Sequence, residues 1–282
     1  MHGSPPNLES FEQVLDDLAR DPRIAPHSPE WIRESVVAGG EKVRILRYIL
    51  DAHPPGGSPP RVLDIGTNIG SFALLAAKHG CRVSAIDYAS YADIYAKIHA
   101  EQGVEFRACD LAADPLPFED NSFDFVTYTD VIEHHAFSPR PVLREIHRVL
   151  APGGRVIILT PNQASIYNRL MLLFGRSIYG VFDHFFDSTP DRSIYLGHHH
   201  EFTRAELRAA LERTGFKVLE SRATEEDLAS LLYFRRRYPE RVVAAHNRFL
   251  LVRAVGPIWS FLHLDFGRVL WAVGEKPRIQ NP

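Results

Sequence analysis

The chemistry-bearing residues that stand out are a glycine turn and an aspartate that follows it along the chain. Segment 62–72 predicts a buried strand, a tight turn at Gly66 and the start of a helix. Glycine lets a backbone turn sharply and approach a ligand without a Cβ in the way, and the amides at a helix start suit an anionic group. Asp87 ends the next predicted strand, about 20 residues after Gly66, where a carboxylate can accept hydrogen bonds from both hydroxyls of a ribose. Together these residues predict a site for a ligand that contains a nucleoside.

Each of these residues also has a purely structural interpretation. A glycine turn can simply join a strand to a helix, and an aspartate after a strand can cap the next helix. A third signal, Asp110 followed by Leu111 after the third predicted strand, is weak alone because aspartate is common in loops. A dinucleotide oxidoreductase is a further alternative, since it also uses a glycine turn and a carboxylate.

The elements that must position these residues alternate along the chain. From residue 61 onward short apolar strands alternate with helices, which predicts a parallel sheet with helices on both faces. The segment 151–154 is expected to end the helix before the fifth strand, and Thr203 with Glu206 forms a capping box that begins a later helix. The predicted strands are 61–65, 82–86, 104–107, 123–128, 155–160, 216–221 and 267–274.

The first 60 residues predict a helical cap followed by a linker. Apolar residues recur at helical spacing from Leu8 to Leu18, and a second helix is expected from Glu41 to Ala52. The proline- and glycine-rich stretch 54–60 indicates a linker. The predicted domains are therefore residues 1–60 and 61–282.

Two segments interrupt the alternation of strands and helices, and we interpret both as lid insertions. Residues 161–200 are rich in aromatic side chains, and residues 225–266 have a largely helical pattern. Aromatic residues with scattered polar groups suit a pocket for an organic ligand, and they suit the core of a lid equally well. In the first insertion these residues are Tyr167, Phe174, Tyr179, Phe182, Phe185, Phe186 and Tyr195, with Asn162 and His184.

The order of the motifs resembles that of the class I methyltransferases that depend on S-adenosylmethionine (SAM). It is most similar to the broad branch that includes quinone-biosynthesis and natural-product O-methyltransferases. The resemblance covers about residues 60–220, and residues 273–277 fit the family's last strand. It favours a methyltransferase over an oxidoreductase, because the Pro-Gly-Gly segment before the fifth strand fits the former better. The matching motifs are 64–70, 87, 110–111, 116–118, 122–126, 130–134, 143–145, 150–154, 202–203 and 215–216.

The resemblance implies an α/β fold: a Rossmann-like class I methyltransferase sheet with an antiparallel last strand, a helical N-terminal cap and an inserted lid. It also implies SAM as the cofactor. Asp64 would bind the methionine ammonium, the turn would meet the methionine carboxylate, Asp87 would bind the ribose, and Asp110 with Leu111 would bind adenine. The predicted cofactor contacts are Asp64, Gly66, Asn68, Gly70, Asp87, Tyr88, Asp110, Leu111 and Thr129. Asn68 departs from the glycine usual in the family, and asparagine tolerates a positive φ better than most residues.

His134 and His135 follow the fourth predicted strand, at the edge where a bound donor would present its methyl group. We predict that one of them deprotonates or orients the acceptor, since histidine titrates near neutral pH. The alternative is that both only bond the backbone and shape the pocket. The predicted reaction is methylation of a hydroxyl oxygen on a small molecule, either a natural-product intermediate or a sugar. The alternatives are N-methylation of a small amine and a SAM-binding regulatory or partner protein without turnover.

Composition narrows the function classes. The chain has 282 residues and a net charge of −3, which gives no overall attraction for nucleic acid. Two cysteines are too few for a disulfide framework, no signal peptide is evident, and no apolar run is long enough to span a bilayer. A cytoplasmic protein is therefore expected.

The run from His198 to His200 invites a metal interpretation. Adjacent residues on a strand point in opposite directions, so three in a row rarely converge on one ion, and no metal site is predicted. Weak peripheral contact with a membrane through residues 231–237, which combine apolar and arginine side chains, stays open as an alternative. A homodimer also stays open.

Overall fold

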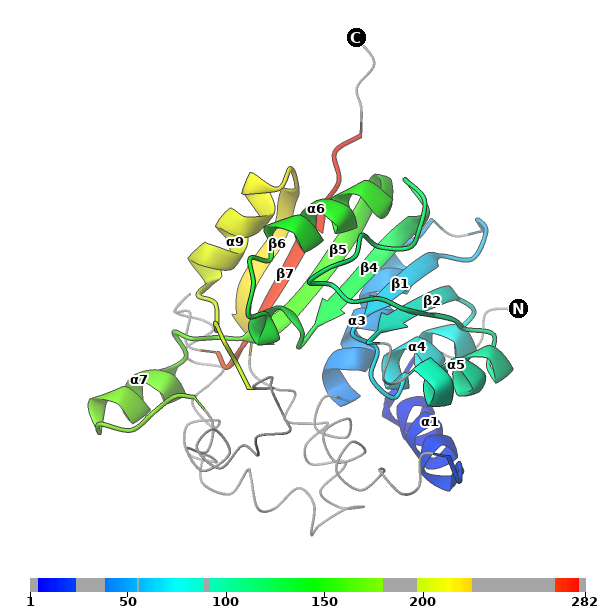
Figure 1. The fold of residues 1–282 in the computed structure, drawn as a ribbon, viewed down its shortest axis with the longest axis horizontal. Helices are drawn as coiled ribbons and strands as arrows, with labels where there is room; N and C mark the ends of the chain where they lie inside the picture. The colour runs from blue at the N-terminus through cyan, green and yellow to red at the C-terminus, as the bar shows by residue number, and fades with distance from the viewer. Residues whose placement is uncertain are drawn as a thin grey trace.

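The computed structural model describes residues 5–23, 39–54, 56–88, 92–179, 197–224 and 267–278 (Figure 1). Its centre is a seven-stranded sheet with the order β3-β2-β1-β4-β5-β7-β6. The strands are β1 (Arg61–Ile65), β2 (Arg82–Asp87), β3 (Glu105–Ala108), β4 (Phe123–Thr129), β5 (Leu150–Pro161), β6 (Lys217–Thr224) and β7 (Val269–Glu275). The predicted α/β fold class is confirmed.

The direction of the strands changes only at one side of the sheet. Strands β1 to β5 pair in parallel, whereas β7 runs antiparallel to both β5 and β6. The last strand is therefore antiparallel, as predicted. The chain moves outward from β1 to β3 and then returns to the other side of β1 as β4. Ligands of open α/β sheets bind where the strand order reverses in this way, beyond the carboxyl ends of the strands.

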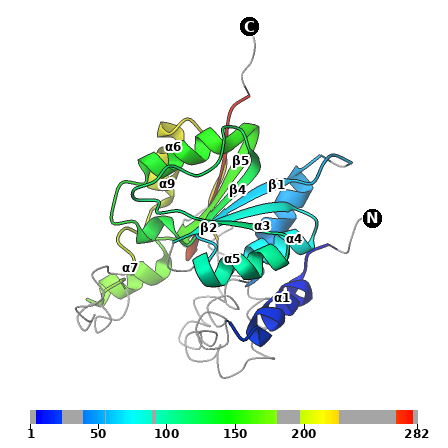
Figure 2. The same cartoon turned by 45° about the vertical axis from the view of Figure 1, so that its right-hand side comes forward.

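Helices cover both faces of the sheet (Figure 2). Neighbouring residues of one strand point to opposite faces, so Val62 packs with the first helix layer and Leu63 with the second. The first layer contains α1 (Leu8–Arg20), α3 (Gly39–Ala52), α4 (Ser71–Lys78) and α5 (Ala92–Glu101), and the second contains α6 (Arg140–Val149) and α9 (Arg204–Arg213).

The N-terminal helices share the core of the sheet. Phe11 and Leu15 of α1 are buried, as the helical spacing predicted. Tyr48 of α3 packs edge-to-face on Trp271 of β7, with ring centroids 5.8 Å apart, and its hydroxyl accepts a hydrogen bond from Arg155 of β5 at 3.2 Å. The division of the chain at residue 60 stays a prediction.

Some boundaries differ from the expected ones. Strand β5 begins at Leu150, so the segment 151–154 belongs to the strand and does not form a separate helix end. Leu150, the first residue of the strand, pairs with Phe123, and the next pair is Arg155 with Phe125. The register shift between these two pairs accommodates the glycines at positions 153 and 154. In the first predicted lid the structure adds helix α7 (Ile166–Leu173). Residues 180–196 of that lid and the whole second lid, 225–266, lie outside the described residues, and so does the segment proposed for membrane contact.

Among the described residues, no helix combines the length and the apolar character needed to cross a bilayer.

A buried histidine supports the glycine turn from the first helix layer. His99 of α5 is 0% exposed, and its Nδ1 lies 2.7 Å from the Tyr95 carbonyl oxygen. Its Nε2 is buried without a hydrogen-bond partner among the described residues, and a Cβ on Gly70 would lie 2.4 Å from that atom. Burial lowers the pKa of His99 below its ordinary value, because a charged imidazole there would lose its hydration.

We expect His99 to make the protein less stable in acid. Below about pH 6.5 the unfolded chain binds a proton at this residue while the folded chain does not, so the free energy of unfolding falls as the pH decreases. Urea unfolding at pH 8 and pH 5 should therefore show a smaller loss of stability for His99→Gln than for wild type. His53→Gln, at a partly exposed histidine before β1, is the control and should follow wild type. Equal losses for all three proteins would contradict the prediction.

Candidate active site

The glycine turn, residues 66–70, connects β1 to α4 and lies against the β4 loop, residues 130–139, which follows β4. Gly66 has a φ of +72°, and a Cβ at this position would lie 2.3 Å from Cγ2 of Val131. Its amide and that of Thr67 donate to the carbonyl oxygen of Ile86, at 3.0 and 3.2 Å. The turn is thus fixed to β2 on one side and to the β4 loop on the other, and only glycine fits between them.

The N-terminus of α4 has the character of an anion site. Its N-cap residue, Gly70, has a φ of +82° and makes no side-chain capping bond. The helix therefore presents backbone amides and the positive end of its dipole at the carboxyl edge of the sheet. These features fit the methionine carboxylate of SAM.

Asp87 ends β2 and faces the same turn. Its carboxylate accepts hydrogen bonds from the amide of Asn68 at 2.7 Å and from the amide of Tyr88 at 2.8 Å. Burial raises the pKa of this carboxyl. Asn68 has a φ of 51°, so the asparagine adopts the left-handed conformation that the turn requires. Asp87 and Asn68 are therefore brought together, and Asn68 makes this bond through its backbone.

Asp64 lies deeper, between β1 and β4. It is 3% exposed, and its carboxylate accepts a hydrogen bond from the Thr127 hydroxyl at 2.7 Å. Burial raises the pKa of Asp64. Sequence reasoning missed Thr127, because its pairing with Asp64 depends on the register of β1 against β4.

The predicted adenine-side residues lie at the ends of β2 and β3. Tyr88 is 50% exposed, and burial together with the charges of Asp110 and Asp87 raises the pKa of its hydroxyl, so these groups are neighbours. The Asp110 carboxylate accepts from the amide of Ala112 at 2.9 Å, and Leu111 packs on the second core layer. Thr129, the last residue of β4, is partly buried. Cofactor contact by all these residues stays a prediction.

The two candidate catalytic histidines have different environments. His135 is 8% exposed, stacks on Phe137 with ring centroids 4.2 Å apart, and places Nε2 3.0 Å from the Tyr128 hydroxyl. Burial lowers its pKa to about 4. His134 is exposed, and its Nδ1 lies 3.2 Å from the Gly197 carbonyl oxygen. Of the two side chains, only that of His134 is open to an acceptor, and a catalytic role for either stays a prediction.

Glu133 links the β4 loop to the segment before α9. It is 1% exposed, and its carboxylate accepts from the Thr160 hydroxyl at 2.9 Å. Its carbonyl oxygen accepts from the amides of His199 and His200, at 2.7 and 3.2 Å. Burial, reinforced by the charge of Asp130, raises the pKa of Glu133 to about 8. From the sequence, Glu133 is expected to have a structural or donor-side role rather than a catalytic one. Nothing in the local pattern signals its contact with the segment before α9.

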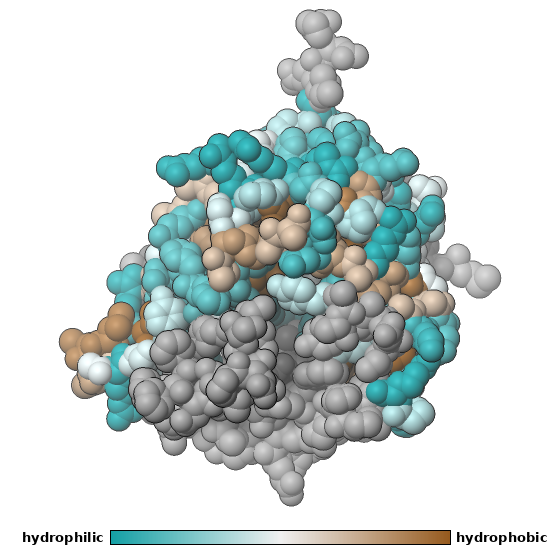
Figure 3. All heavy atoms as spheres, in the orientation of Figure 1, coloured by the Kyte–Doolittle hydropathy of each residue, from teal (hydrophilic) through white to brown (hydrophobic). Residues whose placement is uncertain are grey.

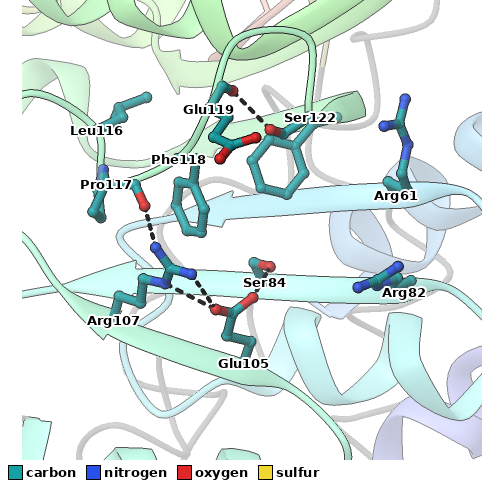
Figure 4. A pocket seen from close by; sticks show the side chains of 11 residues that line it. Arg61, Arg82, Ser84, Glu105, Arg107, Leu116, Pro117, Phe118, Glu119 and Ser122 are labelled. Atoms are coloured by element: carbon teal, nitrogen blue, oxygen red, sulfur yellow. Dashed lines mark hydrogen bonds and ion pairs between the residues drawn. The ribbon is translucent and has the colours of Figure 1, made fainter.

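A hollow at the opposite edge contains none of the predicted site residues. It has a volume of about 660 Å³ and lies at the amino ends of β1 to β4 (Figure 4). There the Arg107 guanidinium pairs with Glu105 and contacts the Pro117 carbonyl oxygen. Because α/β sheets bind ligands beyond the carboxyl ends of their strands, the active site is expected at the glycine turn and not in this hollow.

The described part of the first predicted lid does not form a closed aromatic pocket. Leu173 and Phe174 at the end of α7 are 75% and 74% exposed, and Tyr179 is 39% exposed. Hydrophobic residues are visible at the surface of this helix in Figure 3. Tyr167 instead packs beneath the Arg268 guanidinium, 5.4 Å from the ring centroid. The other aromatic residues predicted for the pocket lie outside the described residues.

Comparison with known proteins decides the family. The family model described as "Methyltransferase domain" matches residues 39–221, which is more than half of the chain. The chain belongs to the class I SAM-dependent methyltransferases. This confirms the predicted family and its cofactor, SAM, and the reaction class of the family is methyl transfer, EC 2.1.1.

Individual relatives of this methyltransferase act on different atoms. The chain is 30% identical over 193 residues to the ubiquinone biosynthesis O-methyltransferase of Xanthomonas axonopodis pv. citri, and the match covers 67% of this chain and 72% of that relative. It is 32% identical over 151 residues to the sarcosine/dimethylglycine N-methyltransferase of Halorhodospira halochloris, covering 46% and 54%. The chain spans about half the length of several curated relatives that it matches.

A solved structure with the same fold is the S-adenosylmethionine dependent methyltransferase of Mesorhizobium loti. It has a TM-score of 0.53 and 19% sequence identity, and the match covers 85% of this chain and 99% of that one. At this identity the similarity concerns the fold.

We expect Asp87→Asn to weaken SAM binding roughly 10- to 100-fold, because hydrogen bonds to a charged carboxylate contribute ~1.5–3 kcal/mol each. Isothermal titration calorimetry with SAM and with S-adenosylhomocysteine measures the effect. Asp51→Asn, at an exposed position of α3, is the matched control and should bind like wild type. An Asp87→Asn affinity within twofold of wild type would show that this carboxylate does not hold the cofactor.

Replacement of Asn68 separates a conformational role from a contact role. Asn68→Gly should keep SAM affinity within about threefold, because glycine adopts the left-handed region without strain. Asn68→Val should weaken binding or lower thermal stability, since that conformation costs an ordinary residue ~1–2 kcal/mol. Calorimetry and thermal unfolding measure the two effects. Loss of binding in Asn68→Gly would instead assign a direct cofactor contact to the asparagine side chain.

Proposed function

We propose that the protein transfers the methyl group of SAM to a hydroxyl oxygen of a small molecule, such as a natural-product intermediate or a sugar, and that it acts in the cytoplasm. The observation that carries the proposal is the contact between Gly66 of the donor turn and Val131 of the β4 loop. The β4 loop continues through a short 3₁₀ helix, η2 (Ile132–His134), so the loop that contacts the donor turn at Gly66 also carries the exposed His134.

SAM supplies the methyl group on a sulfonium centre, which is a good leaving group. The chain then has to hold donor and acceptor close and aligned, and such positioning can contribute ~7–11 kcal/mol in ideal intramolecular cases. The anion-binding end of α4, together with Asp87, would hold the donor, and Asp64 would hold its ammonium group.

A hydroxyl acceptor has a second requirement, because its proton must leave as the O–C bond forms. In this proposal His134 contacts the acceptor and orients or deprotonates its hydroxyl. The His135 ring is buried and is hydrogen-bonded to the Tyr128 hydroxyl of β4. In this proposal His135 therefore does not contact the acceptor and instead positions the β4 loop that carries His134.

The relatives support methyl transfer and leave the acceptor atom to experiment. The Xanthomonas relative is named as an O-methyltransferase and the Halorhodospira relative as an N-methyltransferase. A neutral amine needs less help with its proton than a hydroxyl does, so the exposed imidazole favours an oxygen acceptor. A homodimer stays a prediction.

We expect the purified protein to convert SAM to S-adenosylhomocysteine in the presence of a phenolic or sugar hydroxyl acceptor. His134→Ala should lower kcat by roughly 100-fold or more, with the SAM affinity unchanged within a few-fold. His53→Ala, distant from the carboxyl edge, is the control and should retain activity. Mass spectrometry of the methylated product identifies the acceptor atom.

Two outcomes would overturn this proposal. Turnover with small amines but with no hydroxyl compound would establish N-methylation instead. Tight SAM binding without turnover on any acceptor would favour the regulatory or partner protein.

A further inference from the structure

Three side chains with metal-binding groups meet beside the proposed acceptor position. Glu133, His134 and His198 each offer one ligand atom, and these atoms all lie within 4.8 Å of one another. The rings of the two histidines are 4.9 Å apart and nearly perpendicular. Glu133 and His134 come from the β4 loop and His198 from the segment before α9, so two distant parts of the chain form the cluster.

Backbone bonds fix the two parts of this cluster against each other. The carbonyl oxygen of Glu133 accepts from the amides of His199 and His200, which positions the neighbouring His198. The bond between His134 Nδ1 and the Gly197 carbonyl oxygen adds a second connection. The arrangement therefore does not depend on the side chains alone.

The histidines have the supporting contacts that are typical of metal ligands. His198 Nδ1 lies 2.8 Å from the carboxylate of Glu201, which is 5% exposed and accepts a further bond from Asn168 at 3.1 Å. His134 Nδ1 faces a backbone carbonyl oxygen at 3.2 Å. A carbonyl or carboxylate at Nδ1 favours the tautomer with its proton there, which leaves Nε2 as the nitrogen that can bind a cation.

The carboxylate of the cluster is also suited to a cation. Glu133 is 1% exposed and receives a hydrogen bond from the neutral Thr160 hydroxyl. A buried carboxylate is costly only in its charged form, and a bound cation would compensate that charge. Two imidazoles and one carboxylate are the protein ligands of many catalytic zinc sites, which keep a further position open for water or substrate.

We propose that Glu133, His134 and His198 bind a first-row divalent cation, such as Zn²⁺ or Mn²⁺, which holds the acceptor oxygen. No metal site is predicted from the sequence, because three consecutive histidines on a strand rarely converge on one ion. The proposed site takes only His198 from that run and combines it with two residues of the β4 loop.

The role of the cation rests on the proposed O-methylation, whereas the binding site does not. A hydroxyl bound to the cation loses its proton more readily. The proton leaves to solvent, an O–C bond forms to the methyl group, and the S–C bond of SAM breaks to release S-adenosylhomocysteine. His134 would then act on the acceptor through the cation and not as a separate base.

Direct metal titration tests the site without any assay of activity. The full chain, purified without a histidine tag and stripped with EDTA, is titrated with Zn²⁺ or Mn²⁺ by calorimetry, and Co²⁺ absorption reports the ligand geometry. We expect about one ion per chain and a loss of affinity of at least roughly tenfold in His198→Ala and in Glu133→Gln. His200→Ala is the matched control from the same histidine run and should bind metal like wild type.

Circular dichroism and SAM titration show whether each variant is folded, and if Glu133→Gln is not, His198→Ala decides alone. Metal binding that is absent, or that is equal in wild type and His198→Ala, would overturn the site. If the ion binds as expected but EDTA leaves turnover on a hydroxyl acceptor unchanged, the site stands and its catalytic role is wrong. Failure of turnover under all conditions, with metal binding intact, would count against the proposed function and not against the site.

Discussion

The rest of the site depends on the close contact between two loops at the carboxyl edge of the sheet. Gly66 has no side chain, and Val131 occupies the space in which a Cβ would lie. Any larger residue at Gly66 would push the β4 loop away from the donor turn or distort the turn itself, because protein interiors are closely packed. This contact fixes the distance between the groups that would hold the donor and those that would meet the acceptor.

A second contact of the same kind supports the turn at Gly70. His99 of α5 fills the space beside Gly70, and its ring is held by the Tyr95 carbonyl oxygen. Val131 therefore lies against the turn at Gly66, and His99 lies against it at Gly70. The Asp87 carboxylate also fixes the turn, because it accepts a hydrogen bond from the Asn68 amide. Three different elements therefore specify one backbone conformation, which explains how a non-glycine residue can occupy a left-handed position there.

The β4 loop also organises the acceptor side. The backbone carbonyl of Glu133 holds the histidine segment before α9, while its carboxylate lies against Thr160 at the end of β5. Buried polar groups of this kind need hydrogen-bond partners. The carbonyl and carboxylate of Glu133 find theirs only when β4, β5 and the segment before α9 come together. The geometry of the acceptor side is consequently a product of the assembled fold.

The sequence by itself determined the features that depend on local pattern. The spacing of Gly66 and Asp87 predicted a nucleoside site, and contact of these two residues with the cofactor stays a prediction. The alternation of apolar strands and helices predicted the parallel sheet, and the Thr203–Glu206 capping box marks the start of α9 in the structure. Backbone propensities and short-range bonds decide such features, so they can be read within a window of a few residues. Tertiary structure alone decided that Thr127 bonds Asp64, that Val131 lies on Gly66, that His135 is buried while His134 is exposed, and that His198 meets Glu133. Each of these contacts joins residues from different elements, and it depends on strand register and close packing that no local pattern contains.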